Sequence, residues 1–350
     1  MSYIVLFFFF AMAEPASFTI GAGGDVGFGR YLKSKRYRSH GGEVPFSELQ
    51  PLFSLSDLVF LNLETPLSDV HPPIVLSKRP LKNRLNFRAD IRYAQVLRDA
   101  GVDVVSLANN HMEDCGKVAI ETTSTALDSA EVKHVGAHLT NDPYKPIVFQ
   151  KNGVDIVVFA RSTKRNKGRI GVEPHPDIAY VRAENILSES LPLVSLYREK
   201  YPKAVFLFSM HWGGEYMDIP VRIQRKVARK LIKEGIHVVL GHHPHVLQPV
   251  EVHPTGVILY SMGNLLFDQP RTDTHKSAFF TMNFIWNEGW RTSALQIDPL
   301  QLYAPPKKTH IGSQKAILQT LFQHSKSKQY KTPLAWQGDS LIWKAPAPQK

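Results

Sequence analysis

The chain has 350 residues, with 42 Lys plus Arg against 31 Asp plus Glu, and a formal net charge of +11. A hydrophobic content of 43% and a charged content of 21% exclude a disordered chain and indicate one large folded domain. The positive charge favours encounters with polyanions or acidic surfaces. Cys115 is the only cysteine, which excludes an intramolecular disulfide and argues against a thiol-based site.

The amino terminus carries a short apolar run over residues 3–13 that ends in Ala11-Met12-Ala13, the small-x-small form of a signal-peptidase site. We therefore expect residues 1–16 to be a signal peptide or a truncated export signal, and the protein to be exported or associated with the cell envelope. The run is too short to span a bilayer as a helix, and no lysine or arginine precedes it. A first buried strand is the alternative, and it leaves a cytoplasmic location open.

Apolar runs alternate with amphipathic segments along most of the chain. Runs with strand character cover residues 18–24, 57–63, 102–107, 133–135, 155–160, 204–208, 236–240 and 257–260. Segments with helical spacing cover residues 45–53, 88–100, 117–129, 184–201 and 221–234. Such alternation predicts a layered α/β protein.

The pattern changes toward the carboxyl terminus. Residues 278–297 alternate apolar and polar side chains and predict antiparallel edge strands. Beyond them the chain becomes basic, and residues 336–350 look like a loose tail. We therefore expect a domain over residues 17–298 and a basic carboxy-terminal extension over residues 299–350. A proline-containing surface loop is expected over residues 69–86.

Successive apolar runs end in residues that can bind a metal ion. In chain order these are Asp25, Glu64, Asn110 with His111, His211, and His243 with His245. Polar groups just past the carboxyl ends of strands fall where open α/β sheets place their sites. Carboxylate, amide and imidazole groups suit Mn²⁺, Fe, Zn²⁺ or Mg²⁺. A single junction of this kind is better explained by solvent exposure at a strand end, but its recurrence favours a metal site with enough ligands for two ions.

Six motifs carry a resemblance to a known family. They are GDVGFGR at 24–30, LNLETPL at 61–67, SLANNHMEDCG at 106–116, MHWGGEY at 210–216, GHHPHVLQPVE at 241–251 and YSMGNLLFD at 260–268. Together they resemble the CapA-type capsule synthesis (poly-gamma-glutamate biosynthesis) family, which is related to calcineurin-like metallophosphoesterases. The resemblance implies a layered metallophosphoesterase-like β-sandwich flanked by helices.

The resemblance also implies two divalent metal ions and a ligand for each. Asp25 and His245 would hold the first ion, Glu64 would bridge, and Asn110, His211 and His243 would hold the second. In this chain His242 is an alternative ligand to His243, although the His-x-His spacing favours His243. Two departures from the superfamily pattern are a missing histidine two residues after Asp25 and a glutamate in place of the usual bridging aspartate.

The same resemblance assigns acid–base roles. His111, beside Asn110, would be the general acid that protonates a leaving oxygen, and Asp114 would orient it. Glu215 and Asn264 lie on motif loops, where lining the pocket and purely structural hydrogen bonding are both open.

Three functions follow as hypotheses. The first is an exported, metal-dependent hydrolase-like protein that acts in synthesis, processing or export of an anionic capsule polymer such as poly-gamma-glutamate, with membrane-bound capsule synthesis proteins as further partners. The second is a non-catalytic polymer-binding accessory protein. The third is a nucleotide or nucleic-acid phosphoesterase, which the absence of a recognisable nucleic-acid-binding module in the sequence disfavours.

Overall fold

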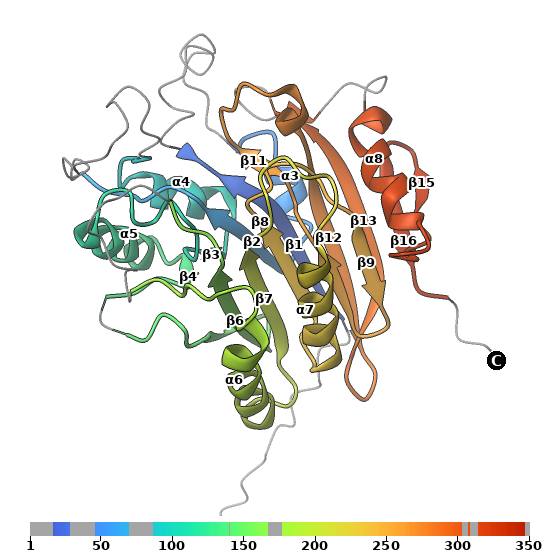
Figure 1. Cartoon of the computed structure of the whole chain (residues 1–350), viewed down its shortest axis with the longest axis horizontal. Coiled ribbons are helices and arrows are strands. Elements are labelled where there is room, and N and C mark those ends of the chain that lie inside the picture. Colours follow the sequence, from blue (N-terminus) through green and yellow to red (C-terminus); the bar gives the residue numbers. More distant parts are fainter. Residues whose placement is uncertain are drawn as a thin grey trace, which may run out of the picture.

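The computed structural model describes residues 17–28, 46–69, 87–139, 141–166, 177–302, 307–308 and 314–346. Two β-sheets pack face to face, and helices cover their outer faces (Figure 1). This arrangement confirms the predicted layered α/β fold, a β-sandwich flanked by helices. The expected signal segment over residues 1–16 and most of the loop over residues 69–86 lie outside the described residues.

The strands occur in this order: β1 (Ser17–Val26), β2 (Leu58–Leu63), β3 (Val104–Ser106), β4 (Lys133–Val135), β5 (Ile147–Lys151), β6 (Val154–Ser162), β7 (Val205–His211), β8 (Val238–His242), β9 (Val250–His253), β10 (Gly256–Leu259), β11 (Asn264–Leu266), β12 (Lys276–Trp286), β13 (Trp290–Gln301), β14 (Lys307–Lys308), β15 (Ala335–Gln337) and β16 (Ser340–Lys344). The helices are α3 (Gln50–Phe53), α4 (Tyr93–Ala100), α5 (Lys117–Ser129), α6 (Ile186–Lys200), α7 (Arg222–Lys233) and α8 (Gln314–Lys326), with a 3₁₀ turn η2 (Thr272–His275).

In the described part of the chain, the first sheet has the order β15-β16-β13-β12-β1-β2-β3-β4, with β11 beside β1 and β14 beside β13. The second sheet has the order β5-β6-β7-β8-β10-β9. Strands β1 to β4 run parallel to one another in the first sheet, as do β6, β7 and β8 in the second. Parallel strands bring their carboxyl ends to one edge of a sheet, and the predicted site residues follow these ends.

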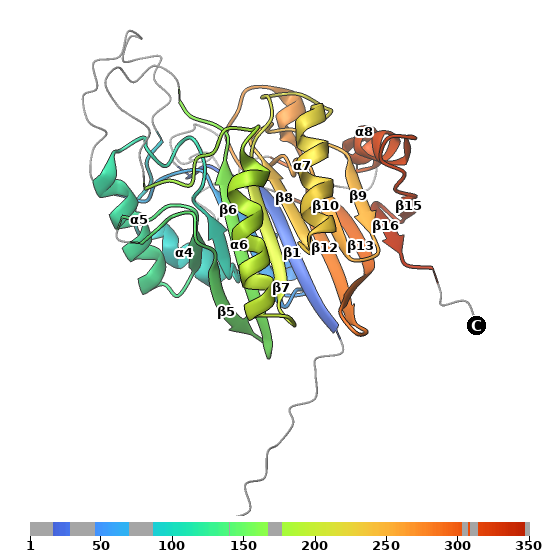
Figure 2. The ribbon, with the colours of Figure 1, turned by 60° about the horizontal axis from the view of Figure 1, so that its bottom comes forward.

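Alternation along the strands divides the apolar side chains between layers. In β6, Ile156 and Val158 face the central core between the two sheets, while Val157 and Phe159 pack toward the helices. Helices α6 and α7 lie over the second sheet (Figure 2), and α3, α4 and α5 contribute to the core on the first. Because strands with helices on one side and a second sheet on the other are buried on both faces, they read in the sequence as continuous apolar runs.

Two expectations about the carboxy-terminal part were wrong. The strands expected at the edge over residues 278–297 are β12 and β13, which lie inside the first sheet because β1 and β16 pair with their outer sides. The expected tail over residues 336–350 contains β16 and the end of β15, and β16 pairs antiparallel with β13. Helix α8 adds Ile317, Leu318 and Leu321 to the central core. Among the described helices, none has the length and apolar character needed to cross a bilayer.

Candidate metal centre

The first sheet contributes the predicted carboxylates and the Asn-His pair. Asp25 lies at the end of β1, Glu64 follows β2 directly, and Asn110 and His111 follow β3. Asp114 lies in the turn that continues from His111. Neighbouring parallel strands deliver all five side chains to one edge of the sheet.

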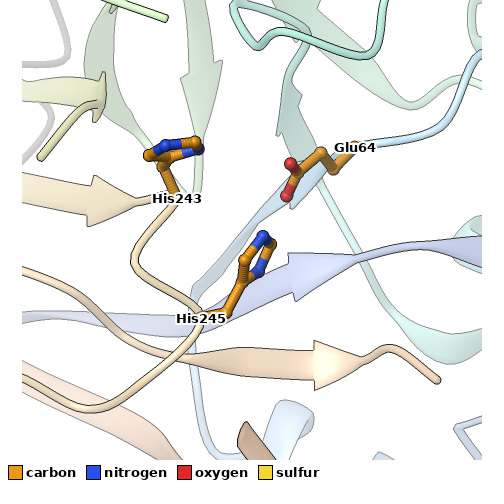
Figure 3. Close-up of side chains that lie close together, drawn as sticks. All are labelled: Glu64, His243 and His245. Atoms are coloured by element: carbon orange, nitrogen blue, oxygen red, sulfur yellow. The ribbon is translucent and has the colours of Figure 1, made fainter. Parts of the chain in front are cut away.

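The second sheet contributes the imidazoles. β7 ends in His211, and β8 ends in His242, whose Cα is paired with that of His211. The turn after β8 holds His243 at φ +93° and His245 at φ +60°, a left-handed conformation that is uncommon for residues other than glycine. Figure 3 shows the carboxylate of Glu64 directed toward the imidazoles of His243 and His245. The backbone conformation of the turn therefore brings two histidines from one short segment to the carboxylate.

All eight predicted site residues are brought together and are buried. Their relative exposures lie between 0% and 7% for Asp25, Glu64, Asn110, His111, Asp114, His211, His243 and His245. The sequence prediction that these residues converge is therefore met by the fold, whereas the role of each as ligand or acid stays a prediction.

Asp25 is held as an anion by its neighbours. Asn62 Nδ2 donates a hydrogen bond of 2.9 Å to Oδ1, and the His243 backbone N–H donates one of 3.2 Å to Oδ2. His242 Nδ1 lies 3.2 Å from Oδ1, and His245 Nδ1 lies 3.2 Å from Oδ2. Burial alone would raise the pKa of Asp25, but the interactions with His242 and His245 hold that pKa well below its usual value.

Glu64 has the opposite environment. Its carboxylate is fully buried, and neither oxygen has a hydrogen-bond partner within the described residues. Burial raises the pKa of Glu64 well above its usual value, and the charges of Asp25, Glu215 and Asp114 raise it further. Buried polar atoms without a partner are rare and call for an explanation such as an ion. A cation beside these oxygens would satisfy them.

The nitrogen ligands surround the same carboxylate. His211 Nε2 lies 3.6 Å from Glu64 Oε1, 3.2 Å from His243 Nδ1 and 2.7 Å from Asn110 Oδ1. Burial lowers the pKa of His211 well below its usual value, with His243 as the next cause. Burial likewise lowers the pKa of His243, followed by the charge of His245. Both imidazoles are therefore neutral, which is the form that binds a metal ion.

Two groups of side chains offer ligand atoms within 4.8 Å of one another. One is Glu64, His243 and His245, and the other is Asp25, Glu64 and His211. Glu64 belongs to both groups, which suits the bridging position that the resemblance implied. The donor set and the unpartnered Glu64 oxygens fit a divalent metal ion. The expected division of the ligands between two ions stays a prediction.

His111 and Asp114 form a close pair at the edge of the cluster. His111 Nδ1 lies 2.8 Å from Asp114 Oδ2, and that oxygen also accepts a hydrogen bond of 2.7 Å from the Phe87 backbone N–H. The Phe87 ring stacks on the imidazole with centroids 4.0 Å apart. His111 Nε2 remains on the side of the cluster, 3.9 Å from Glu64 Oε1. This arrangement can present one imidazole nitrogen to a bound substrate.

Two further asparagines bind site residues, although no sequence pattern predicted a role for them. Asn62 donates to Asp25, and its position two residues before Glu64 was the available signal. Asn166 accepts a hydrogen bond of 2.7 Å from Asn110 Nδ2, and nothing in the basic segment around it indicated this. Asn264, for which both roles were open, has Oδ1 2.8 Å from His245 Nδ1. Because that oxygen accepts, His245 carries its proton on Nδ1, which leaves Nε2 free.

The family and the relatives that the chain matches are named for capsule, PGA or polyglutamine synthesis. Residues 19–269 match the family described as bacterial capsule synthesis protein PGA_cap. The chain is 30% identical over 304 residues to the PGA biosynthesis protein CapA of Bacillus subtilis (strain 168), covering 86% of this chain and 77% of that protein. It is 29% identical over 297 residues to the capsule biosynthesis protein CapA of Bacillus anthracis, covering 83% and 68%. It is 26% identical over 190 residues to a probable polyglutamine synthesis accessory protein of Mycobacterium tuberculosis (strain ATCC 25618 / H37Rv), covering 50% and 47%.

The similarity of the chain to solved structures is lower. A hypothetical protein from Thermus thermophilus has a TM-score of 0.44 and 18% identity, covering 82% of this chain and 100% of that one. The Haemophilus influenzae NAD nucleotidase (NadN) has a TM-score of 0.46 and 12% identity, covering 87% of this chain and 62% of that one.

Proposed function

Because the chain belongs to the bacterial capsule synthesis family PGA_cap, we propose that it is a metal-dependent hydrolase-like protein that acts on an anionic capsule polymer such as poly-gamma-glutamate. The relatives named for capsule, PGA and polyglutamine synthesis support the polymer. The net charge of +11 agrees with an acidic substrate. Export to the cell envelope belongs to the same proposal and rests on the apolar run over residues 3–13.

One observation carries the hydrolase part of the proposal. A fully buried glutamate, Glu64, has two oxygens without hydrogen-bond partners in the described structure and lies among neutral imidazoles. A carboxylate in that position is unfavourable by itself and becomes favourable when a cation sits beside it. Burial of the cluster also strengthens the electrostatic interactions inside it.

The residues of the chain then have separate tasks. Asp25, Glu64, Asn110, His211 and the imidazoles of the turn after β8 would hold the metal ions. When bound, such ions polarise the scissile group and lower the pKa of water. His111 would donate a proton from Nε2 to the leaving atom, because its Nδ1 is held by Asp114. The stacked Phe87 ring excludes water from one face of that imidazole.

The first experiment measures metal content per chain after purification without chelators. Wild type is compared with a Glu64→Ala, His243→Ala double variant. A Glu121→Ala, His253→Ala double variant is the matched control, because both residues lie outside the cluster. We expect about two transition-metal ions in wild type and control and none in the site variant. Loaded wild type is then assayed on phosphoesters and on poly-gamma-glutamate. A wild type that takes up neither Mn²⁺ nor Zn²⁺ would contradict the hydrolase proposal.

A second candidate function, a non-catalytic polymer-binding accessory, is favoured by one face of α7. Arg222, Lys226 and Lys233 are exposed there and form no ion pair with any described residue. Their spacing places them on the solvent side of the helix, opposite the buried Val227 and Leu231. Three unpaired cations on one face suit an acidic polymer.

Binding and turnover separate the two candidates. A triple variant with glutamine at Arg222, Lys226 and Lys233 should bind poly-gamma-glutamate more weakly than wild type, whether the protein is a hydrolase or an accessory. A control triple variant with glutamine at exposed Arg291, Lys328 and Lys344 carries the same change in net charge. A hydrolase loses turnover in a His111→Asn variant that still binds polymer. If the protein is an accessory, wild type shows no turnover of the polymer. The His111→Asn variant should then support polymer assembly as well as wild type does.

A further inference from the structure

Asn166 joins the two halves of the candidate metal centre. It follows β6 of the second sheet, and the segment leading to it is anchored by a hydrogen bond of 2.9 Å from the Thr163 N–H to the His211 carbonyl. Its side chain reaches the turn after β3 of the first sheet. There it accepts from Asn110 Nδ2 at 2.7 Å and donates to Asp114 Oδ1 at 3.2 Å.

The first of these bonds fixes the orientation of the Asn110 amide. An amide can bind a metal ion only through its oxygen, and a flip would present the nitrogen instead. Because Asn110 Nδ2 donates to Asn166 Oδ1, Asn110 Oδ1 faces His211 Nε2 at 2.7 Å. A side chain at position 166 that only accepts a hydrogen bond from Asn110 Nδ2 would keep the Asn110 amide in this orientation. Without such a side chain, the amide would be free to flip.

The second bond acts on the His111 pair. Asp114 Oδ2 contacts His111 Nδ1 at 2.8 Å, and its Oδ1 accepts from Asn166 Nδ2. Both oxygens of Asp114 are therefore engaged, so the carboxylate cannot rotate without breaking a contact. Asn166 Nδ2 also lies 3.4 Å from His111 Nδ1. The orientation of the imidazole, with Nε2 toward Glu64, depends on this arrangement.

We propose that Asn166 is a positioning residue that holds the Asn110 oxygen toward His211 with one end of its amide and holds Asp114 against His111 with the other. The inference rests on the proposed function, because the consequence of the first contact is metal affinity and that of the second is proton donation. Residues that orient metal ligands change metal affinity or activity by about 10- to 100-fold when they are replaced.

The two ends of the amide can be separated by substitution. Asn166→Ala removes both contacts. Asn166→Asp keeps an oxygen that accepts from Asn110 but places a second oxygen against Asp114. The matched control is Asn152→Asp, because Asn152 Nδ2 also donates to a carboxylate, Asp57 Oδ1 at 2.8 Å, in the turn just before β6, at the opposite end of that strand.

Metal affinity is measured by chelator competition, together with the visible spectrum of the Co²⁺-loaded protein. We expect Asn166→Ala to weaken affinity by about 10- to 100-fold and to change the spectrum. Asn166→Asp should restore the affinity and the spectrum of wild type but not the rate of hydrolysis. Asn152→Asp should change none of these. Wild-type affinity in Asn166→Ala, or equal weakening in Asn166→Ala and Asn166→Asp, would overturn the inference.

A metal-free arm keeps the inference separate from the proposed function. The urea midpoints of Asn166→Ala, Asn110→Ala and the double variant are compared in chelator. Because the two side chains share one hydrogen bond, we expect the double variant to shift the midpoint by less than the sum of the single shifts. Additive shifts overturn the positioning role. A wild type that binds no metal but shows non-additive shifts removes the hydrolase proposal and leaves the positioning role supported.

Discussion

Replacing Glu64 with glutamine should stabilise the protein without metal and abolish its stabilisation by metal. Glu64 has a relative exposure of 0%, and neither carboxylate oxygen has a hydrogen-bond partner within the described residues. An unsatisfied buried group destabilises a protein by about 1–3 kcal/mol, and more when it is charged. Glutamine still lacks partners but carries no charge. We therefore expect a gain of about 1 kcal/mol, or about 2 °C in Tm for a large domain.

The stability difference between the Glu64→Gln variant and wild type should depend on pH. The folded protein raises the pKa of Glu64 above its ordinary value of 4.5, through burial first and the charge of Asp25 second. A raised pKa contributes stability below the unfolded value, and that contribution is lost as pH rises through the folded value. The glutamine variant has no such loss. The Tm difference between variant and wild type in chelator should therefore be near zero at acid pH and should grow as pH rises.

Metal reverses the order of the two proteins. At a free metal concentration of about 100 times Kd, wild type should gain about 2.7 kcal/mol, or about 5 °C in Tm. The glutamine variant should gain little, because the carboxylate that belongs to both ligand groups has become a neutral amide. Calorimetry in chelator and in Mn²⁺ or Zn²⁺ measures both effects on the same samples.

Glu251→Gln is the matched control. Glu251 is also buried, at 3% exposure, but it accepts from Arg229 at 2.9 Å and from the Tyr260 hydroxyl at 2.7 Å. Losing a satisfied buried charge should lower Tm with and without metal and should leave the metal-induced shift intact. If Glu64→Gln behaves like Glu251→Gln, Glu64 is a structural carboxylate and the reasoning is refuted.

Three other substitutions test other parts of the structure. His111→Asn should reduce hydrolysis by about 10²- to 10⁴-fold and keep the metal-induced Tm shift, and loss of that shift would make His111 a ligand instead. Burial lowers the pKa of His237 from 6.5 to about 3, and its Nδ1 accepts from the Phe206 N–H, so wild type should lose stability as pH falls from 6.5 toward 3. His237→Asn, which keeps an acceptor, should flatten a urea-midpoint series over that range, and an unchanged slope would count against this assignment. Gly24→Ala would place a Cβ 2.0 Å from the Gly263 carbonyl oxygen and should destabilise by about 3 kcal/mol in urea titration, whereas a near-neutral result would show that β1 and β11 can separate freely.

The strand ends were predictable because the signal is local. An apolar run followed at once by Asp25, Glu64 or His211 fixes both the strand and the side chain that leaves it. Parallel pairing then brings the ends together without further information in the sequence. The positions of β12 and β16 were not predictable in this way. Apolar and polar side chains alternate in the same way along edge strands and interior strands. The sequence of a strand therefore does not show that β13 lies between β12 and β16.

The contacts of Asn166 and Asn62 differ in how far the sequence could reveal them. Asn62 lies next to a motif residue, so its position on β2 follows from that of Glu64. Asn166 reaches Asn110 across 56 positions in the chain, through a segment whose composition indicates only a basic loop. Hydrogen bonds between side chains that are distant in sequence depend on the packing of the two sheets, which no local pattern encodes.

That packing also supplies the imidazoles that lie beside Asp25. Residue 27 is glycine, so β1 supplies no imidazole two positions after the carboxylate. β8 of the other sheet supplies His242, whose Nδ1 lies 3.2 Å from Asp25 Oδ1. An imidazole therefore reaches Asp25 from the second sheet. Because each half of the cluster is completed by the opposite sheet, the contact between the sheets and the geometry of the site are set together.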